Sequence, residues 1–160
     1  MLQKLKFGHA LPPGRVLGEL LAGVVLHSQV DVLVPVPLHP HRLRERGFNQ
    51  ALEIARPVGR ALGVPVVPRA CRRTRDTPPQ SSLGARARRR NPLDAFAATD
   101  AISGARVALI DDVYTSGSTV AAVTHALLHA GAIRVEAWCV ARAGTGVRAK
   151  YRTRGSGTLL

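Results

Sequence analysis

Residues 106–119 read RVALIDDVYTSGST, and this stretch decides the fold. Its apolar beginning predicts a buried strand over Arg106–Ile110, and a helix is expected over Ser118–His129, ended by Gly131. Two carboxylates, small hydroxylated residues and a glycine separate the strand from the helix. Ligands of open parallel sheets bind beyond the carboxyl ends of the strands, which is where this transition falls. The stretch therefore predicts a strand–loop–helix binding site.

The chemistry of this loop suits a phosphorylated sugar. The backbone N–H groups of Tyr114–Thr119 can surround a phosphate, the helix adds the positive end of its dipole, and Gly117 permits close approach. Asp111 and Asp112 are suited to accept hydrogen bonds from vicinal ribose hydroxyls. An ordinary helix N-cap would need a single polar residue, and no Gly-Lys-Ser/Thr of a Walker loop is present. The expected contacts are Asp111, Asp112, Val113, Tyr114, Thr115, Ser116, Gly117, Ser118 and Thr119.

The rest of the chain alternates between helix and strand patterns. Short apolar runs and helical spacings predict the following elements: a helix at Val16–Leu26, a strand at Asp31–Val36, an ordered loop at Pro37–Arg46, a helix at Asn49–Leu62 that Pro57 should kink, and strands at Val64–Val67 and Ile133–Val140. This alternation predicts an α/β fold with a mostly parallel sheet flanked by helices.

A long basic segment interrupts this alternation. Arg69–Asn91 has no steady period and carries eight arginines, with Asp76 as its one acidic residue. We expect a mobile loop, with a helical turn near Ala85–Arg90. The Gly-, Arg- and Thr-rich end of the chain is expected to fray. The predicted organisation is one domain over residues 1–143, containing this loop at about residues 69–93, and a tail over residues 144–160.

Composition and charge narrow the class of protein. The net charge of +13, from 23 basic and 10 acidic residues, favours polyanionic partners. No apolar run reaches the ~20 residues that span a bilayer, and no secretory signal is recognisable. We therefore expect a cytoplasmic protein without membrane insertion. Cys71 and Cys139 are expected to be free thiols, and two cysteines cannot form a structural zinc site.

Three weaker signals are set aside. His125 and His129 have the spacing of helical metal ligands, but the apolar stripe of their helix lies on the opposite side, so we expect both to face solvent. Residues 144–149 fit a dinucleotide-binding pattern, although no helix follows them. Trp138 is expected in the core. No metal site made by protein side chains alone is predicted.

Residues 107–119 resemble the PRPP-binding signature of type I phosphoribosyltransferases. Further matches narrow the resemblance to the ComF family, which is linked with DNA uptake during natural competence. These matches are VPVP at 34–37, RGFNQ at 46–50, and the pattern of Arg73, Arg75, Thr77, Gln80, Leu83, Arg88, Asn91 and Phe96. The resemblance runs from about Leu5 to Arg142. Family members usually begin with a cysteine-rich zinc ribbon, and this chain starts where that segment would end, so no zinc is expected.

The resemblance implies a type I phosphoribosyltransferase-like fold that binds PRPP or a nucleoside monophosphate, with Mg²⁺ held through PRPP oxygens. Pro37–Arg42 would match the pyrophosphate-binding loop, and Arg69–Asn91 a flexible hood over the substrate. The implied catalytic residues are Asp111, Asp112, Arg73 and Arg75. Besides the signature loop, the implied PRPP contacts are Pro37, Leu38, His39, Arg42, Arg46, Thr77 and Gln80.

Three functions stay open from the sequence: phosphoribosyl transfer to an unidentified acceptor, non-catalytic binding of single-stranded DNA, and nucleotide sensing. The basic excess favours DNA, and Arg86, Arg88, Arg89 and Arg90 are the candidate contacts. Single-strand sites combine charge with aromatic stacking, and aromatics make up only 4% of this chain. Neither the other competence proteins that could be partners nor the oligomeric state can be deduced from the sequence.

Overall fold

The computed structural model describes residues 12–74, 95–143 and 152–154. Its central sheet has four strands in the order β1-β4-β5-β6. The first three run parallel and the last is antiparallel to its neighbour: β1 (Val32–Pro35), β4 (Arg106–Tyr114), β5 (Arg134–Arg142) and β6 (Arg152–Arg154). A second, antiparallel sheet pairs β2 (Cys71–Arg73) with β3 (Phe96–Ala98). The predicted mostly parallel sheet is confirmed.

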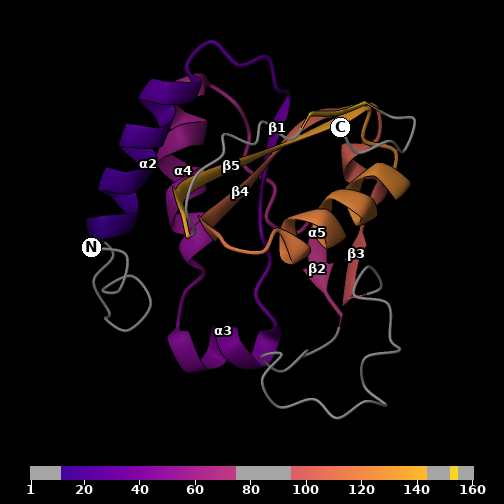
Figure 1. The fold of residues 1–160 in the computed structure, drawn as a ribbon, viewed down its shortest axis with the longest axis horizontal. Coiled ribbons are helices and arrows are strands. Elements are labelled where there is room, and N and C mark those ends of the chain that lie inside the picture. The colour runs from indigo at the N-terminus through magenta and orange to yellow at the C-terminus, as the bar shows by residue number, and fades with distance from the viewer. Residues whose placement is uncertain (1–11, 75–94, 144–151, 155–160) are drawn as a thin grey trace.

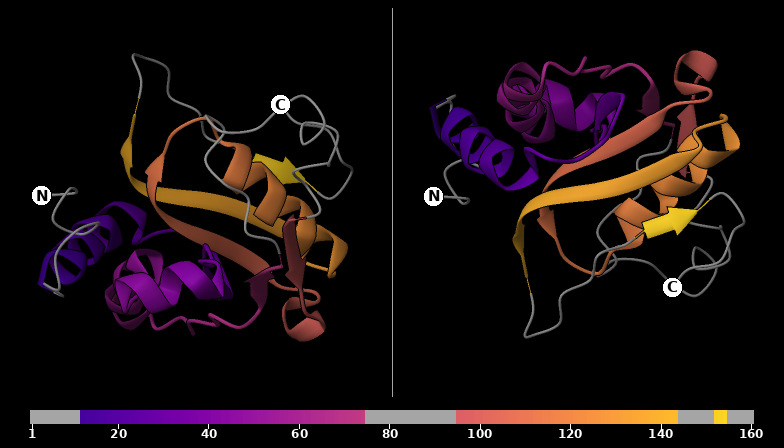
Figure 2. Two further views of the ribbon diagram at one scale, coloured as in Figure 1. Left: turned by 90° about the horizontal axis from the view of Figure 1, so that it is seen from below. Right: turned by 90° about the horizontal axis from the view of Figure 1, so that it is seen from above.

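Helices cover both faces of the central sheet (Figures 1 and 2). One face carries α2 (Pro12–Val25) and α4 (Gln50–Leu62), and the other carries α5 (Ser118–His129). The short α3 (Pro40–Arg46) lies apart from these layers, and the 3₁₀ turn η4 (Asp100–Ile102) precedes β4. This arrangement is the layered α/β architecture that the alternation of patterns predicts.

The core has two parts, one on each face of β4. Leu109 packs with Val123 and Leu127 of α5, whereas Ile110 packs with Ile54 of α4 on the opposite face. Successive residues of a strand point to opposite faces, so an uninterrupted apolar strand is what a sheet covered on both sides requires. Trp138 is buried with the α4 side of the core, as the sequence predicts.

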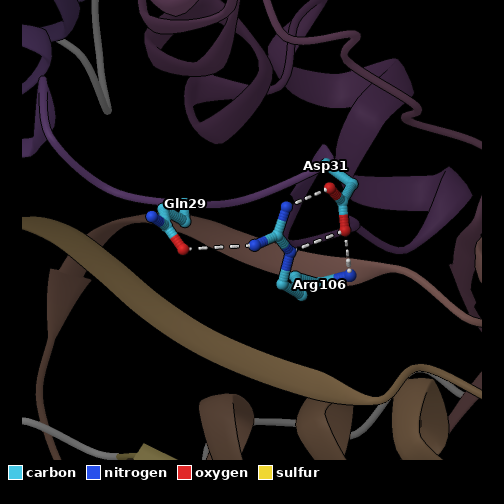
Figure 3. A network of polar contacts seen from close by, with 3 residues as sticks. All are labelled: Gln29, Asp31 and Arg106. Atoms are coloured by element: carbon cyan, nitrogen blue, oxygen red, sulfur yellow. Dashed lines mark hydrogen bonds and ion pairs between the residues drawn. The ribbon is translucent and has the colours of Figure 1, made fainter.

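A polar clamp fixes the register of β1 and β4 at their amino ends (Figure 3). The guanidinium of Arg106 donates to both carboxylate oxygens of Asp31. The distance from Nε to Oδ2 is 3.0 Å, and the distance from Nη2 to Oδ1 is 2.7 Å. The backbone N–H of Arg106 donates to the same carboxylate at 2.8 Å, and Nη1 reaches Gln29 Oε1 at 3.4 Å. Because two parallel hydrogen bonds fix the relative orientation of the guanidinium and the carboxylate, this pair constrains the two strands more than a single contact between charges would.

Several predicted boundaries are wrong. The expected loop at Pro37–Arg46 contains α3, because His39 caps a helix that Pro40 can begin and Gly47 ends it in a left-handed conformation (φ 74°). The expected strand at Val64–Val67 forms only an isolated bridge between Val66 and Leu33.

Two segments that we expected to lack structure contain strands. Cys71–Arg73, inside the predicted basic loop, forms β2 because it pairs with Phe96–Ala98. Arg152–Arg154, inside the predicted frayed tail, pairs with β5 as β6. The rest of the loop, from residue 75 to residue 94 with its expected helical turn, lies outside the described residues, as do residues 144–151 and 155–160.

The helix α4 continues through Pro57 from Gln50 to Leu62, so the proline ends no element. Pro57 is buried, and a Cβ built on Gly18 of α2 would lie 2.3 Å from its Cγ. The absence of a side chain at Gly18 thus lets α2 pack closely on the proline ring. Across the described residues, no helix is long and apolar enough to cross a bilayer.

Candidate functional site

The carboxyl ends of β1 and β4 and the amino ends of α4 and α5 lie at the edge of the sheet that faces α3 in Figure 1. Two hydrogen bonds hold this edge together. The N–H of Val36 donates to the carbonyl of Ile110 at 2.8 Å, and Asn49 Nδ2 donates to the carbonyl of Val36 at 3.0 Å. Asn49 also caps α4, since its Oδ1 accepts from the N–H of Ala51 at 3.0 Å. Ligands of open α/β sheets bind beyond the carboxyl ends of the strands, so this edge is where we expect a ligand.

The two acids of the predicted site stand at the end of β4. The strand reaches Tyr114 rather than ending at Ile110, so both acids belong to it. Alternation along the strand directs Asp111 to the α5 face, after Leu109, and Asp112 to the α4 face, after Ile110. Each carboxylate accepts a 2.9 Å hydrogen bond from the N–H of the following residue. Both side chains are half-buried, and they lie on either side of the strand end.

A three-residue turn joins β4 to α5, shorter than the loop that we predicted. It consists of Thr115, Ser116 and Gly117, because Tyr114 is still in the strand and Ser118 already begins α5. Gly117 occupies the N-cap position with φ 77° and provides no side-chain cap. The first N–H groups of α5 have no acceptor within the helix and point towards this edge. Anion binding at a helix amino end uses such groups.

Hydroxyl groups surround the turn. Ser116 Oγ and Ser118 Oγ are 2.9 Å apart, and the Ser118 N–H lies 3.4 Å from Ser116 Oγ. Thr115, Ser116, Ser118 and Thr119 are exposed, whereas Val113 and Tyr114 are half-buried. The predicted phosphate contacts of this segment are thus brought together on an accessible turn.

Arg142 is a candidate contact that sequence reasoning missed. It pairs in register with Tyr114 at the end of β5, and its guanidinium carbon lies 5.5 Å from the centre of the Tyr114 ring. The N–H of Ala143 donates to the Tyr114 carbonyl at 2.9 Å, which holds the two strand ends together. Only the register of β5 against β4 places this positive charge beside the turn, and no sequence motif marks it.

Cys139 lies next to the acid pair, in register with Asp111. Its burial raises the pKa of the thiol to about 12, and the negative charges of Asp111 and Asp112 add to that shift. The carboxylates thus create a local field that favours protonated or cationic groups. Burial also raises the pKa of Cys71 to about 11, and both cysteines are free.

The predicted contacts after β1 lie just before α3 or within it. Pro37 is buried, Leu38 and His39 are half-buried, and Nδ1 of His39 accepts from the N–H of His41 at 3.3 Å. His41 also approaches Glu45 at 3.6 Å. Within the described parts of the chain, three arginines of α3 have no acidic partner: Arg42 and Arg46, which are half-buried, and Arg44, which is exposed.

Arg73 is placed on β2 rather than in a mobile loop, with its guanidinium carbon 5.6 Å from the centre of the Phe96 ring. The other predicted contacts of the basic segment lie outside the described residues: Arg75, Thr77, Gln80, Arg86, Arg88, Arg89 and Arg90. On α5, His125 and His129 are exposed with ring centres 4.3 Å apart, so the predicted solvated face is confirmed.

The acid pair fits Mg²⁺ only together with a ligand. In residues 12–74, 95–143 and 152–154, no group of three or more His, Cys, Asp or Glu side chains could hold a metal ion. Mg²⁺ needs octahedral oxygen coordination and is often bound by one or two carboxylates together with substrate phosphates. Asp111 and Asp112 could supply such carboxylates, and phosphate oxygens of the ligand would complete the shell.

Comparisons with known proteins give relatives along most of the chain, although no protein-family model matches it. The DNA utilization protein YhgH of Escherichia coli K12 is 37% identical over 149 residues, which cover 89% of this chain and 66% of the relative. Competence protein F of Haemophilus influenzae is 31% identical over 153 residues, which cover 89% of this chain and 67% of the relative. The chain thus spans about two thirds of the length of these curated relatives.

Solved structures with a similar fold include an allosteric regulatory enzyme of purine biosynthesis, with a TM-score of 0.57 and 21% identity. The match covers 79% of this chain and 25% of that one. Glutamine PRPP amidotransferase from B. subtilis, complexed with ADP and GMP, gives a TM-score of 0.54, also at 21% identity, over 79% of this chain and 26% of that one. At this level of identity the likeness establishes the fold, which is that of the type I phosphoribosyltransferases.

Proposed function

This chain belongs to the ComF family of competence proteins, with a type I phosphoribosyltransferase-like fold, and from that premise we propose that it binds PRPP or a nucleoside 5′-monophosphate. The observation that carries the proposal is the position of the acid pair. Asp111 and Asp112 lie on either side of the end of β4, and the turn Thr115–Gly117 follows at the amino end of α5. A phosphate binds to N–H groups at the amino end of a helix, and a ribose diol donates hydrogen bonds to carboxylates. This segment supplies both kinds of partner.

The proposed arrangement places the 5′-phosphate on the first N–H groups of α5, with hydroxyls of the turn as further donors. The ribose then lies across the end of β4, where one carboxylate from each face accepts a hydrogen bond from a ring hydroxyl. Arg142, beside Tyr114, adds a positive charge next to the phosphate. Mg²⁺, when bound with PRPP, neutralises part of the charge of the diphosphate.

Transfer of the phosphoribosyl group is the reaction that this arrangement fits. The bond between C1 of the ribose and the pyrophosphate oxygen breaks, a nucleophile forms the new bond at C1, and pyrophosphate leaves. Positive charge that develops on the sugar ring would be stabilised by Asp111 and Asp112. The chain's other contribution is to hold the sugar in one orientation. Arginines of the basic segment, among them Arg73 and Arg75, would stabilise the pyrophosphate.

Isothermal titration of the double variant Asp111→Asn, Asp112→Asn tests this assignment. PRPP–Mg²⁺ and ribose 5-phosphate should bind at least about tenfold more weakly than to the wild type, because the diol loses two charged acceptors. Inorganic phosphate should bind as well or better, since two negative charges beside the phosphate are removed. A parallel loss of phosphate binding would show that the acids do not recognise the sugar.

Binding of single-stranded DNA is a second candidate, favoured by the DNA-related names of the relatives and by the arginines of α3, which have no acidic partner among the described residues. We place such DNA on the outer side of α3 and on the segment 86–90, with the protein in the cytoplasm. Affinity should then fall with salt at a slope of about −0.7 per phosphate neutralised. Replacing Arg44, Arg86, Arg88, Arg89 and Arg90 by Ser should flatten that slope and spare PRPP binding. Equal slopes in the two proteins would exclude this role.

A further inference from the structure

One buried side-chain amide at the proposed site has no hydrogen-bond partner in the part of the chain that the structure describes. Gln50 is only 3% exposed, and its Nε2 donates to no atom of residues 12–74, 95–143 or 152–154. Buried donors without an acceptor are rare in folded proteins, because the lost hydration is not replaced. A leucine would fill a similar volume without this penalty. The amide at position 50 therefore needs an explanation other than packing.

Gln50 lies at the edge of the sheet that carries the acid pair. It is the first residue of α4, next to Asn49, which bonds to the carbonyl of Val36 at 3.0 Å. Val36 in turn bonds to Ile110 at 2.8 Å, and Asp111 follows Ile110 in β4. The amino end of α4 thus lies beside the end of β4, on the face of the sheet opposite to α5 (Figure 2).

The two helices therefore present two separate amino ends to a ligand that crosses the end of β4. The proposed 5′-phosphate occupies the amino end of α5. The opposite end of the same sugar carries the diphosphate at C1, which would lie on the α4 side. The positive end of the α4 dipole favours an anion there. Gln50 is the buried donor at this end, and a diphosphate offers oxygen atoms as acceptors.

We propose that Nε2 of Gln50 donates a hydrogen bond to the C1 diphosphate of PRPP and so distinguishes PRPP from ligands that carry only the 5′-phosphate. This inference rests on the proposed function and adds a specificity-determining residue to the same site. Because the amide is neutral, it contributes a directed hydrogen bond rather than a general attraction for anions. Its burial fixes the side chain before the ligand arrives, which limits the loss of entropy on binding.

The test compares the wild type with Gln50→Leu, using two probes, PRPP–Mg²⁺ and ribose 5-phosphate, in isothermal titration. In Gln50→Leu the affinity for PRPP should fall at least about tenfold, whereas that for ribose 5-phosphate should stay within about twofold. Without ligand, the midpoint of thermal unfolding should be unchanged or higher, since an unpaired donor has been removed. Gln29→Leu makes the same chemical change at the amino edge of the sheet and should alter neither affinity.

Other results would overturn the inference in distinguishable ways. An equal change in both affinities would mean that Gln50 does not contact the diphosphate. Unchanged affinities with a lower unfolding midpoint would give Gln50 a purely structural role. If the wild type bound neither probe, the proposed function and this inference would both fail. As a second variant, Gln50→Glu keeps the shape but replaces the donor by an acceptor, and it should weaken PRPP binding more than Gln50→Leu does.

Discussion

The hydroxyl of Tyr114 lies so close to Gly117 that a Cβ built on the glycine would be 2.3 Å from it. Gly117 also has φ 77°, a conformation that disfavours other residues. Two separate constraints therefore exclude a side chain from the turn between β4 and α5. The absence of a side chain at Gly117 lets the Tyr114 ring pack against this turn.

The two constraints at Gly117 can be measured separately. Gly104 has φ 74° but nothing within 4 Å of an added Cβ, so Gly104→Ala reports the conformational penalty alone, about 1–2 kcal/mol. Gly117→Ala should lower the free energy of unfolding by more than this, because it adds the contact with Tyr114. In a Tyr114→Ala background, Gly117→Ala should cost only the conformational penalty, because the contact between the new Cβ and the Tyr114 ring is no longer made. Equal losses in the two single variants, measured by urea unfolding, would show that the contact with Tyr114 is unimportant.

Asn49 joins α4 to β1, and its two functions can also be separated. Asn49→Ala removes both the cap of α4 and the donor to the Val36 carbonyl, and should lower the free energy of unfolding by about 1–3 kcal/mol. Asn49→Asp keeps the cap and loses only the donor, so it should be less destabilising. Urea unfolding of both variants decides the matter, and a loss in Asn49→Asp as large as in Asn49→Ala would assign the whole effect to the bond with Val36.

The clamp between Asp31 and Arg106 should make stability depend on pH in acid. Hydrogen bonds from Arg106 lower the pKa of Asp31 to about 2. A carboxyl group with a lowered pKa stabilises the folded state above its unfolded pKa of about 3.9 and loses that contribution as pH falls towards 2. Wild type should therefore unfold at a higher temperature than Asp31→Asn at pH 5, and the two midpoints should converge near pH 2. A constant difference between them would contradict the assigned ion pair.

Both cysteines should react slowly in the folded protein. Burial raises the pKa of Cys71 to about 11 and that of Cys139 to about 12, so little thiolate exists near pH 8. Alkylation by iodoacetamide at pH 8 should be at least about a hundredfold slower than in urea, where the thiols have ordinary pKa values. Asp111→Asn with Asp112→Asn should speed the reaction of Cys139, while that of Cys71 serves as the internal control and should not change.

The sequence was most informative where one local pattern determines one element. Val107–Ile110 could be predicted as a buried strand because four apolar residues in a row fit a sheet covered on both faces. The strand β2 could not be predicted, since three residues show no periodicity and its pairing with β3 is distant in sequence. Likewise, Pro57 was expected to kink α4, and its contact with Gly18 of α2 depends on tertiary packing.

The candidate site shows the same contrast between residues marked by one local pattern and residues placed by tertiary packing. Asp111, Asp112 and the turn up to Thr119 could be named together as a candidate site, because one continuous segment contains them. Arg142 lies beside the turn only through the register of β5 with β4, and Gln50 lies at this edge only because α4 begins there. No spacing in the sequence reveals either relationship, since both depend on how separate elements pack.

The central claim is that the turn from Thr115 to Thr119 binds the phosphate of a phosphorylated ribose. Isothermal titration of PRPP–Mg²⁺ into wild type and Gly117→Val tests it most directly, with circular dichroism to verify that the variant is folded. The account predicts saturable binding at one site in the wild type and an affinity at least about tenfold lower in the variant, because a branched side chain would cover the turn. Unchanged affinity in a folded Gly117→Val protein would contradict it.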